Sequence, residues 1–309
     1  MRENDTGTDY PVLYPTKRPP SQDGERVPTG SKLSACADLI RIDLALGAGF
    51  FLVAGQILAT GGLPPTGPVL LGFLTLFFIS GSANISNDYF DRDVDRINLP
   101  SRPLPSGRIS VRELWILFSL FTVAGLTAAA LLGPLVLSLV LLLWGIALLY
   151  NMKLKESGVF GNLIVATCLG MIFILGGLIA GTINGVILTF AALAFFFDLG
   201  EEIASDAMDI SGDQVRSAES LAKRRGRDSA LRVSGLMFGI FYLLTLLPFL
   251  MGWLGYDYLA LVLLMDLFMI SCTLQLMRSR TVDEGRVQVR RLYLAWGLFV
   301  IVFALTRIL

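Results

Sequence analysis

The chain has 309 residues, of which 54% are hydrophobic and only 16% are charged, and it contains no histidine. A soluble globular domain carries about 25% charged residues, so this composition excludes a soluble enzyme, a disordered chain and a disulfide scaffold. The same composition excludes a nucleic-acid binder, and because the 25 basic and 25 acidic side chains balance, the bulk charge indicates no partner.

Polar residues make up the N-terminal segment. Residues 1–35 hold five of the 13 prolines and no apolar run long enough for a signal peptide. We therefore expect a disordered tail over residues 1–35, followed by one membrane domain over residues 36–309.

Long stretches without charge dominate the rest of the chain. Residues 44–87 and 114–152 contain no Asp, Glu, Lys or Arg, and turn signals such as Gly133-Pro134 divide these stretches. About 20 apolar residues cross a bilayer as a helix, and these runs lack the alternation of a barrel. The sequence predicts an all-α, polytopic membrane protein with nine transmembrane helices, at about 40–61, 68–88, 111–132, 135–152, 159–181, 183–208, 230–252, 258–277 and 291–307.

The basic residues support this count of spans. With nine spans, 24 of the 25 Lys and Arg side chains fall on one face, in the tail and in alternate loops such as 89–112 and 278–291. Basic residues accumulate on the cytoplasmic side of membrane proteins. We therefore expect a multi-pass protein of the cell membrane with its N-terminus in the cytoplasm.

Two acidic clusters lie on this basic face. At the end of the second span, Asn87, Asp91 and Asp95 are spaced i, i+4, i+8, with Asn84 one turn earlier, and a continuous helix would point them the same way. Asp88 and Asp93 between them are expected to be solvated charges that balance neighbouring arginines. At the end of the sixth span, the acidic residues Glu202, Asp206, Asp209 and Asp213 also share one helical face.

Stacked carboxylates repel one another, and acidic residues near lipid are costly and usually functional. A divalent cation would neutralise them, and oxygen-only donors suit Mg²⁺ bound together with phosphate. The two clusters are separated by four spans, an even number, so they lie on the same face. The sequence predicts a site for a metal-bound diphosphate between them.

Basic residues complete the expected site. Tyr150, Lys153 and Lys155 follow the fourth span on the same face, and lysine binds phosphate as a point charge. Arg102 lies in a loop that prolines make stiff. The simpler alternative for these side chains is anchoring at the membrane surface.

The order of four motifs resembles the UbiA superfamily of intramembrane prenyltransferases: Asn87-Asp88-x-x-Asp91-x-x-x-Asp95, Arg102-Pro103-x-Pro105-Ser106-Gly107, Tyr150-x-x-Lys153 and Asp206-x-x-Asp209-x-x-Gly212-Asp213. The resemblance covers residues 36–309. It implies nine helices around a central cavity that opens sideways to lipid. It also implies a prenyl diphosphate donor, a lipophilic acceptor and two Mg²⁺ ions.

Carried onto this chain, the resemblance assigns the metal ligands to Asn87, Asp91, Asp95, Asp206, Asp209 and Asp213. Of the acidic ligands, Asp91, Asp95, Asp209 and Asp213 are the catalytic candidates, together with Lys153, which with Tyr150 would contact the diphosphate. The family commonly has its lysine four residues after the tyrosine, where this chain has Leu154, so Lys153 and Lys155 are both candidates. Further substrate-binding candidates are Asn84, Arg102, Arg41 and Asp43.

The motifs are most similar to those of ether-lipid-forming members, whose acceptor is geranylgeranylglyceryl phosphate. Arg41-Ile42-Asp43 resembles the start of the first span in para-hydroxybenzoate members, but Leu44-Ala45 replaces their Lys-Pro. Aromatic or quinone precursors and chlorophyll-type acceptors are the alternatives, with cyclisation of the prenyl chain behind them. A cation-coupled transporter is the alternative of another class, and it would need ionisable groups near the midplane, where Asp198 and Asp266 are the candidates.

Overall fold

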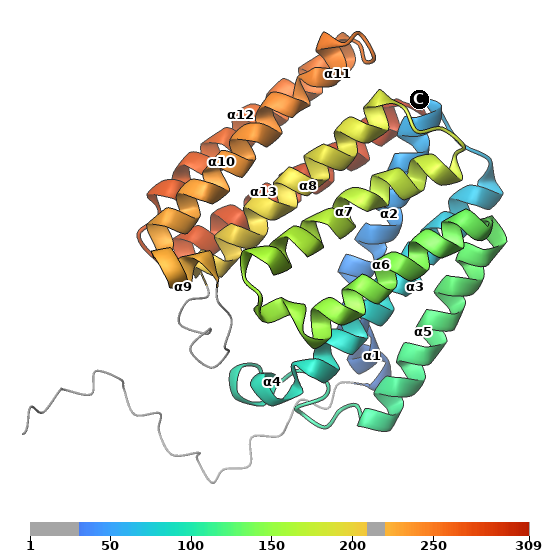
Figure 1. Cartoon of the computed structure of the whole chain (residues 1–309), viewed down its shortest axis with the longest axis vertical. Helices are drawn as coiled ribbons and strands as arrows, with labels where there is room; N and C mark the ends of the chain where they lie inside the picture. Colours follow the sequence, from blue (N-terminus) through green and yellow to red (C-terminus); the bar gives the residue numbers. More distant parts are fainter. Residues whose placement is uncertain (1–30, 209–219, 309) are drawn as a thin grey trace, which may run out of the picture.

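A computed structural model describes residues 31–208 and 220–308 (Figure 1). Within these ranges all regular structure is helical, and eight helices are long and apolar enough to cross a membrane. They are α2 (Ile42–Thr60), α3 (Thr66–Phe90), α5 (Val111–Leu132), α6 (Pro134–Met152), α7 (Val159–Ile179), α10 (Arg227–Thr245) continued by α11 (Leu247–Leu250), α12 (Tyr256–Arg278) and α13 (Val282–Thr306).

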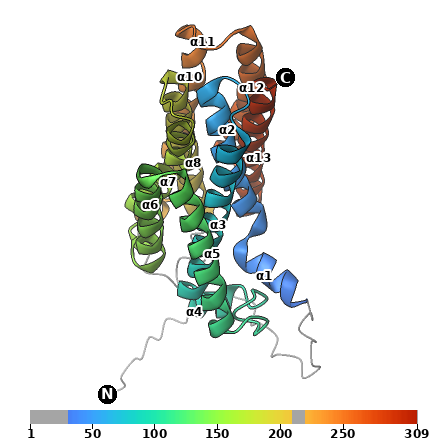
Figure 2. The same cartoon turned by 90° about the vertical axis from the view of Figure 1, so that its right-hand side faces the viewer.

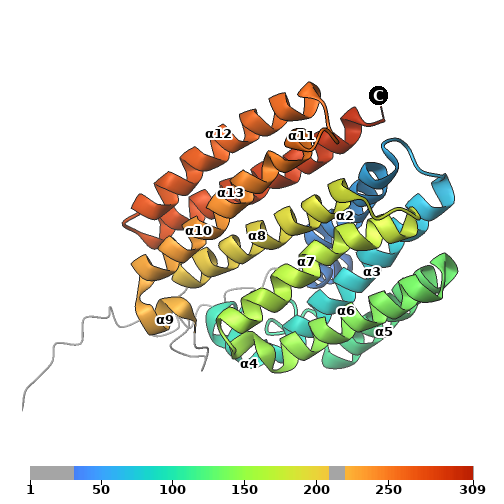
Figure 3. The ribbon, with the colours of Figure 1, turned by 45° about the horizontal axis from the view of Figure 1, so that its top comes forward.

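The ninth long helix of the described ranges is α8 (Gly185–Met208), which has 24 residues. Its C-terminal half carries four acidic side chains, so its composition alone does not mark it as a membrane span. The structure nevertheless packs it along its length between α7 and α10 (Figure 3). The tertiary structure therefore supplies the ninth member of the predicted bundle.

The first and last spans differ from the predicted bounds. Helix α1 (Lys32–Ile40) begins four residues before the expected boundary at 36, and Arg41, with φ 52°, separates it from α2. Helix α13 begins at Val282 rather than near 291. A capping box causes this early start, because Thr281 accepts from the Glu284 backbone amide while the Glu284 side chain accepts from the Thr281 amide. Arginines assigned to a loop therefore lie on a helix.

Aromatic side chains form the centre of the core. Phe190 of α8 lies against Phe173 of α7 and stacks on Phe299 and Phe303 of α13. Helices α2 and α7 approach closely where Gly176 meets Gly55, since a Cβ on Gly176 would lie 2.9 Å from the Gly55 backbone. On the outside, α5 and α6 present exposed leucines, as a lipid-facing surface requires.

The two ends of the bundle differ. The links α2–α3, α5–α6 and α7–α8 lie at the end that also holds α11 and the C-terminus (Figure 1). The opposite end holds the short helices α1, α4 (Arg92–Asn98) and α9 (Leu221–Arg225), as Figures 1 and 2 show. The described residues of the sequence motifs lie at this second end.

Candidate active site

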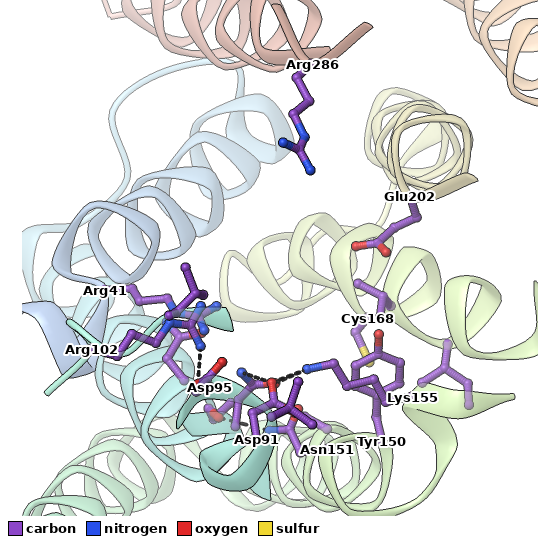
Figure 4. Close-up of a pocket in the computed structure, with 18 residues that line it drawn as sticks. Arg41, Asp91, Asp95, Arg102, Tyr150, Asn151, Lys155, Cys168, Glu202 and Arg286 are labelled. Atoms are coloured by element: carbon purple, nitrogen blue, oxygen red, sulfur yellow. Dashed lines mark hydrogen bonds and ion pairs between the residues drawn. The ribbon is translucent and has the colours of Figure 1, made fainter. Parts of the chain in front are cut away.

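A cavity of about 720 Å³ opens at the end of the bundle that holds α1 and α4 (Figure 4). Helices α3, α4, α6, α7, α8 and α13 contribute to its wall. The wall combines three carboxylates with four basic side chains: Asp91, Asp95, Glu202, Arg41, Arg102, Lys155 and Arg286. An apolar part of the wall is formed by Ala83, Ala147, Ile164, Val165 and Cys168. The cavity lining thus combines charged side chains with apolar ones.

The first acidic motif keeps one face across the end of a helix. Helix α3 ends at Phe90, but Asp91 remains in the right-handed helical region and α4 begins at Arg92. The Asp91 amide donates to the Asn87 carbonyl at 2.9 Å, and the Asp95 amide to the Asp91 carbonyl at 2.8 Å. Asn87, Asp91 and Asp95 therefore all line the cavity, and the Asn87 amide donates to Asp91 Oδ2 at 3.1 Å.

The structure brings Lys155 to this motif and leaves Lys153 outside. Helix α6 ends at Met152, and a 3₁₀ turn, η1 (Leu154–Glu156), redirects the chain. Lys155 Nζ donates to Asn87 Oδ1 at 2.9 Å and to Asp91 Oδ2 at 2.5 Å, whereas Lys153 is exposed and does not line the cavity. Of the two lysine candidates, the structure therefore brings Lys155, and not Lys153, to the cavity. Tyr150, two residues before the end of α6, does line the cavity.

A buried carboxylate holds two arginines at the cavity. Asp88 is 3% exposed and accepts from Arg41 Nη2 at 3.0 Å and from Arg102 Nη1 at 3.4 Å. Arg102 Nη1 also donates to Asp95 Oδ2 at 2.6 Å. The expectation that Asp88 is solvated is wrong, because it lies on the inner side of α3, although it does balance arginines. Asp93 is a surface charge paired with Arg92 and Arg96, as expected.

Two further candidates take different positions. Asn84 lines the cavity and donates to the Ile40 carbonyl at 2.9 Å, which ties α3 to the end of α1. Asp43 is exposed on the first turn of α2 and does not line the cavity. It lies two residues beyond Arg41, about 200° around the helix, so the two side chains point in different directions.

The second acidic motif is described only in part. Asp206 accepts from Asn162 Nδ2 at 3.0 Å, but it does not line the cavity. Asp209 and Asp213 lie outside the described residues. Glu202, one turn before Asp206, lines the cavity from α8. The described structure therefore places the C-terminal part of α8 opposite the first motif, with Glu202 as its contribution to the wall.

Glu202 belongs to an acidic group on α8. Carboxylate oxygens of Asp198, Glu201 and Glu202 lie within 4.8 Å of one another. Glu201 accepts from Ser205 Oγ at 3.1 Å, and within the described residues the buried Asp198 Oδ2 has no hydrogen-bond partner. The sequence analysis named Asp198 only as a midplane candidate and did not name Glu201. Their i, i+3, i+4 spacing with Glu202 was the available signal.

Other functional candidates carried weaker signals. Asn151 donates to the Ala83 carbonyl and to Ser86 Oγ, and so fixes the end of α6 against α3. Arg286 reaches the cavity from α13, within a segment that the sequence assigned to a loop. Asp266 of α12, a midplane candidate, accepts from Thr245 inside the bundle and does not line the cavity.

The sequence relatives of this chain indicate one protein family. The family model of the UbiA prenyltransferase family matches residues 48–305. The digeranylgeranylglyceryl phosphate synthase of Methanococcus aeolicus is 32% identical over 251 residues, which are 80% of this chain and 88% of the relative. The digeranylgeranylglyceryl phosphate synthase of Methanosarcina mazei is 34% identical over 260 residues, covering 78% of this chain and 88% of the relative.

Several solved structures share the fold of this chain. A structure from a study of digeranylgeranylglyceryl phosphate synthase in membranes has a TM-score of 0.74 at 25% identity and covers 90% of this chain and 99% of its own. A UbiA homologue from Aeropyrum pernix K1 has a TM-score of 0.71 at 22% identity, covering 85% and 98%. A UbiA homologue from Archaeoglobus fulgidus, bound to GPP and Mg²⁺, has a TM-score of 0.68 at 20% identity, covering 89% and 99%.

These likenesses confirm the predicted fold class, an all-α bundle of membrane helices around a cavity. They also exclude the alternative of a transporter, since the family model and the sequence relatives are those of prenyltransferases. The chain belongs to the UbiA prenyltransferase family and is a multi-pass membrane prenyltransferase.

Proposed function

We propose that this enzyme transfers a prenyl group from an allylic prenyl diphosphate to geranylgeranylglyceryl phosphate, in the presence of Mg²⁺. The observation that carries this proposal is that Asp91, Asp95 and Glu202 line the same cavity as Lys155 and a set of apolar side chains. Relatives named digeranylgeranylglyceryl phosphate synthase support the acceptor. The relative bound to GPP and Mg²⁺ supports the donor and the metal.

The donor atoms of the cavity fit magnesium. The described wall offers carboxylate and amide oxygens, which are the ligands that Mg²⁺ prefers. The Lys155 ammonium already lies between Asn87 Oδ1 and Asp91 Oδ2, so these oxygens face a positive charge. The residues that would hold two ions are Asn87, Asp91, Asp95, Asp206, Asp209 and Asp213. When bound, Mg²⁺ supplies Lewis-acid stabilisation of the negative charge on the leaving pyrophosphate.

Basic side chains of the chain itself act on the same leaving group. Lys155 and Arg102 line the cavity next to Asp91 and Asp95, where a diphosphate would share their charge. As the bond between C1 of the prenyl group and the diphosphate oxygen breaks, negative charge grows on that oxygen. Preorganised cations at this position lower the barrier because they need no reorganisation during the reaction.

The apolar wall acts on the other fragment. Loss of pyrophosphate leaves an allylic carbocation, which water would quench. Ala147, Ile164 and Val165 line the cavity and offer water no hydrogen-bonding side chain beside the carbocation. The ring of Tyr150 lies in the same wall, where its π face can stabilise a cation. The acceptor hydroxyl then forms the new carbon–oxygen bond and releases its proton to the departing pyrophosphate.

Incubation of the purified chain with geranylgeranyl diphosphate and a panel of acceptors tests this function. We expect a doubly prenylated glyceryl phosphate in the lipid mass spectrum, together with Mg²⁺-dependent release of pyrophosphate. EDTA should stop both, and added Mg²⁺ should restore them. A product formed only with an aromatic acid such as para-hydroxybenzoate would contradict the proposed acceptor.

We further propose that the end of the bundle with the cavity faces the cytoplasm, because nearly all basic residues belong to that face. Single cysteines at Pro100 and Arg280 probe this end, and one at Tyr256 probes the other; all three positions are exposed. An impermeant maleimide should label positions 100 and 280 from the cytoplasmic side and position 256 from outside. Labelling of 100 and 280 from opposite sides would contradict the topology.

A further inference from the structure

The outer face of α5 carries a shallow groove of about 830 Å³. Helix α5 lies at the edge of the bundle, away from the active-site cavity (Figures 1 and 3). The residues that line the groove recur at intervals of three and four, so they share one face of the helix. They are Arg112, Trp115, Ile116, Ser119, Leu120, Val123 and Ala124. The α5 groove therefore follows the helix along the surface that meets lipid.

The length of the α5 groove matches one leaflet of a bilayer. Between Arg112 and Ala124 the helix rises about 18 Å, at about 1.5 Å per residue. The hydrocarbon core of a bilayer is about 30 Å thick, so one leaflet contributes about 15 Å. Ile116, Leu120 and Val123 are 52%, 62% and 63% exposed along this length. The groove thus fits a single lipid chain in extended form.

A basic side chain marks one end of the α5 groove. Arg112 is exposed on the first turn of α5, and in the described part of the chain it takes part in no ion pair. The neighbouring Glu113 already pairs with Lys32 Nζ at 2.7 Å. Arg112 therefore presents a positive charge at the end of the helix, where lipid headgroups lie.

A second, smaller pocket of about 200 Å³ adjoins this end of the groove. It lies between α4 and the start of α5, and Arg92 and Arg96 line it. The Arg92 guanidinium carbon lies 4.4 Å from the centre of the Tyr89 ring, and that ring lies 4.8 Å from the ring of Trp115, centre to centre. Since Trp115 lines the α5 groove, the arginine pocket and the groove meet at Tyr89.

The combined charge of the two features is positive. Asp93 Oδ2 lies 3.8 Å from Arg92 Nε, and Asp93 Oδ1 lies 3.4 Å from Arg96 Nη1. With Arg112, three guanidinium groups therefore share one carboxylate. Guanidinium groups present a planar fork of N–H donors that matches phosphate oxygens. Basic residues beside a membrane helix attract anionic lipids, and tryptophan favours the interface.

We propose that the α5 groove and the arginine pocket bind an anionic phospholipid of the surrounding bilayer. Its phosphate would lie between Arg96 and Arg112, and one of its chains would follow the groove past Leu120 to Ala124. This lipid is distinct from both substrates, because none of the lining residues of these two features lines the active-site cavity. It binds whichever acceptor the enzyme uses.

Native mass spectrometry of the full chain, titrated with phosphatidylglycerol or phosphatidylcholine in detergent, tests the site. Wild type should bind phosphatidylglycerol more tightly than phosphatidylcholine. In Arg96→Gln/Arg112→Gln, the Kd for phosphatidylglycerol should rise at least about tenfold and the preference should disappear, because the attraction of each arginine for an anionic headgroup is lost. Ala124→Phe fills the groove without changing charge and should weaken both lipids alike. Unchanged phosphatidylglycerol binding in either variant would overturn the site.

Arg278→Gln/Arg291→Gln is the matched control. These two arginines are exposed on α12 and α13, and they line neither the groove nor the pocket. The control removes the same charge and should keep the preference for phosphatidylglycerol. An equal loss of preference in the control would show that net charge acts without a site, and the inference would fail.

The remaining arms distinguish other occupants. In vesicles of phosphatidylcholine, Arg96→Gln/Arg112→Gln should keep the wild-type KM for both substrates, since neither residue belongs to the active-site cavity. A raised KM for the acceptor would assign the groove to a substrate and overturn the inference. Inorganic phosphate should not displace phosphatidylglycerol, and full displacement would reduce the site to one for a free anion.

A second copy of the chain is the last competitor for the α5 groove. Leu120→Cys should show no more cross-linking by a bifunctional maleimide than wild type when the enzyme is in vesicles, because lipid covers this face. Efficient cross-linking between two copies through position 120 would make the groove a protein interface and refute lipid binding there.

Discussion

The two acidic regions of the cavity neutralise their charge in different ways. In the first motif, Asp88, Asp91 and Asp95 each contact a basic side chain of the chain itself. On α8, the described contacts of the acidic group are to neutral partners or absent: Glu201 accepts from Ser205, and the buried Asp198 Oδ2 has no hydrogen-bond partner among the described residues.

This difference has an electrostatic consequence. A carboxylate beside a guanidinium or ammonium group is stable without any ligand. Carboxylates whose oxygens lie within 4.8 Å of one another, as on α8, repel each other when charged. The first region is therefore organised by the protein alone, whereas the α8 region gains most from a cation taken up from solution.

The largest expected effect is loss of turnover when a proposed ligand is removed from either acidic motif of the sequence. Asp91→Ala and Asp209→Ala should each lower the rate at least about a thousandfold, since several kcal/mol of transition-state stabilisation depend on neutralising the diphosphate. Release of pyrophosphate measures the rate. Asp93→Ala is the control, because its side chain is 70% exposed and points away from the cavity. Equal loss in Asp93→Ala would contradict the assignment of ligands within the first motif.

A smaller effect is expected when the lysine of the first region is removed. Lys155→Ala should lower kcat about a hundredfold, which is the usual cost of losing one donor to a developing anion. Lys153→Ala should keep nearly wild-type activity, because Lys153 is exposed outside the cavity. Steady-state kinetics of both variants compares them. The reverse order of the two losses would restore Lys153 as the diphosphate ligand.

The smallest expected effect is on stability without metal, and only the first region should lose stability when a carboxylate is neutralised. In EDTA, Asp91→Asn removes a carboxylate that pairs with Lys155 and should lower the melting temperature by a few degrees, for a loss of about 1–3 kcal/mol. Glu202→Gln relieves repulsion on α8 and should leave the melting temperature unchanged or raise it. Thermal unfolding in detergent measures both.

Added Mg²⁺ should then stabilise the wild type more than Glu202→Gln, because the variant has less repulsion to relieve. A fall in the melting temperature of Glu202→Gln as large as that of Asp91→Asn would refute the contrast between the two regions.

Much of the fold could be predicted from the sequence because the bilayer leaves few choices. Backbone groups in lipid must find their hydrogen bonds within the segment, so long apolar runs become helices. Most predicted span ends agree with the structure within a few residues. The shared face of Asn87, Asp91 and Asp95 was also predictable, since the helical period survives the change from α3 to α4.

The start of the last span is a feature that hydropathy did not predict. Hydropathy placed its start near 291, but a local capping box at Thr281 and Glu284 starts α13 at Val282. Hydropathy does not register such a cap, so the arginines of this segment were assigned to a loop. Only the helix places Arg286 and Arg290 on one face beside α8.

The helices, their order and the face that carries the motifs could be predicted because they depend on local hydrophobicity and periodicity. Which charged side chains contact one another depends on the packing of the helices. Lys155 contacts Asp91 across 64 residues of chain, and Arg102 and Arg41 share the buried Asp88. Such pairings depend on how helices pack and where each one ends, and spacing along the chain does not contain that information.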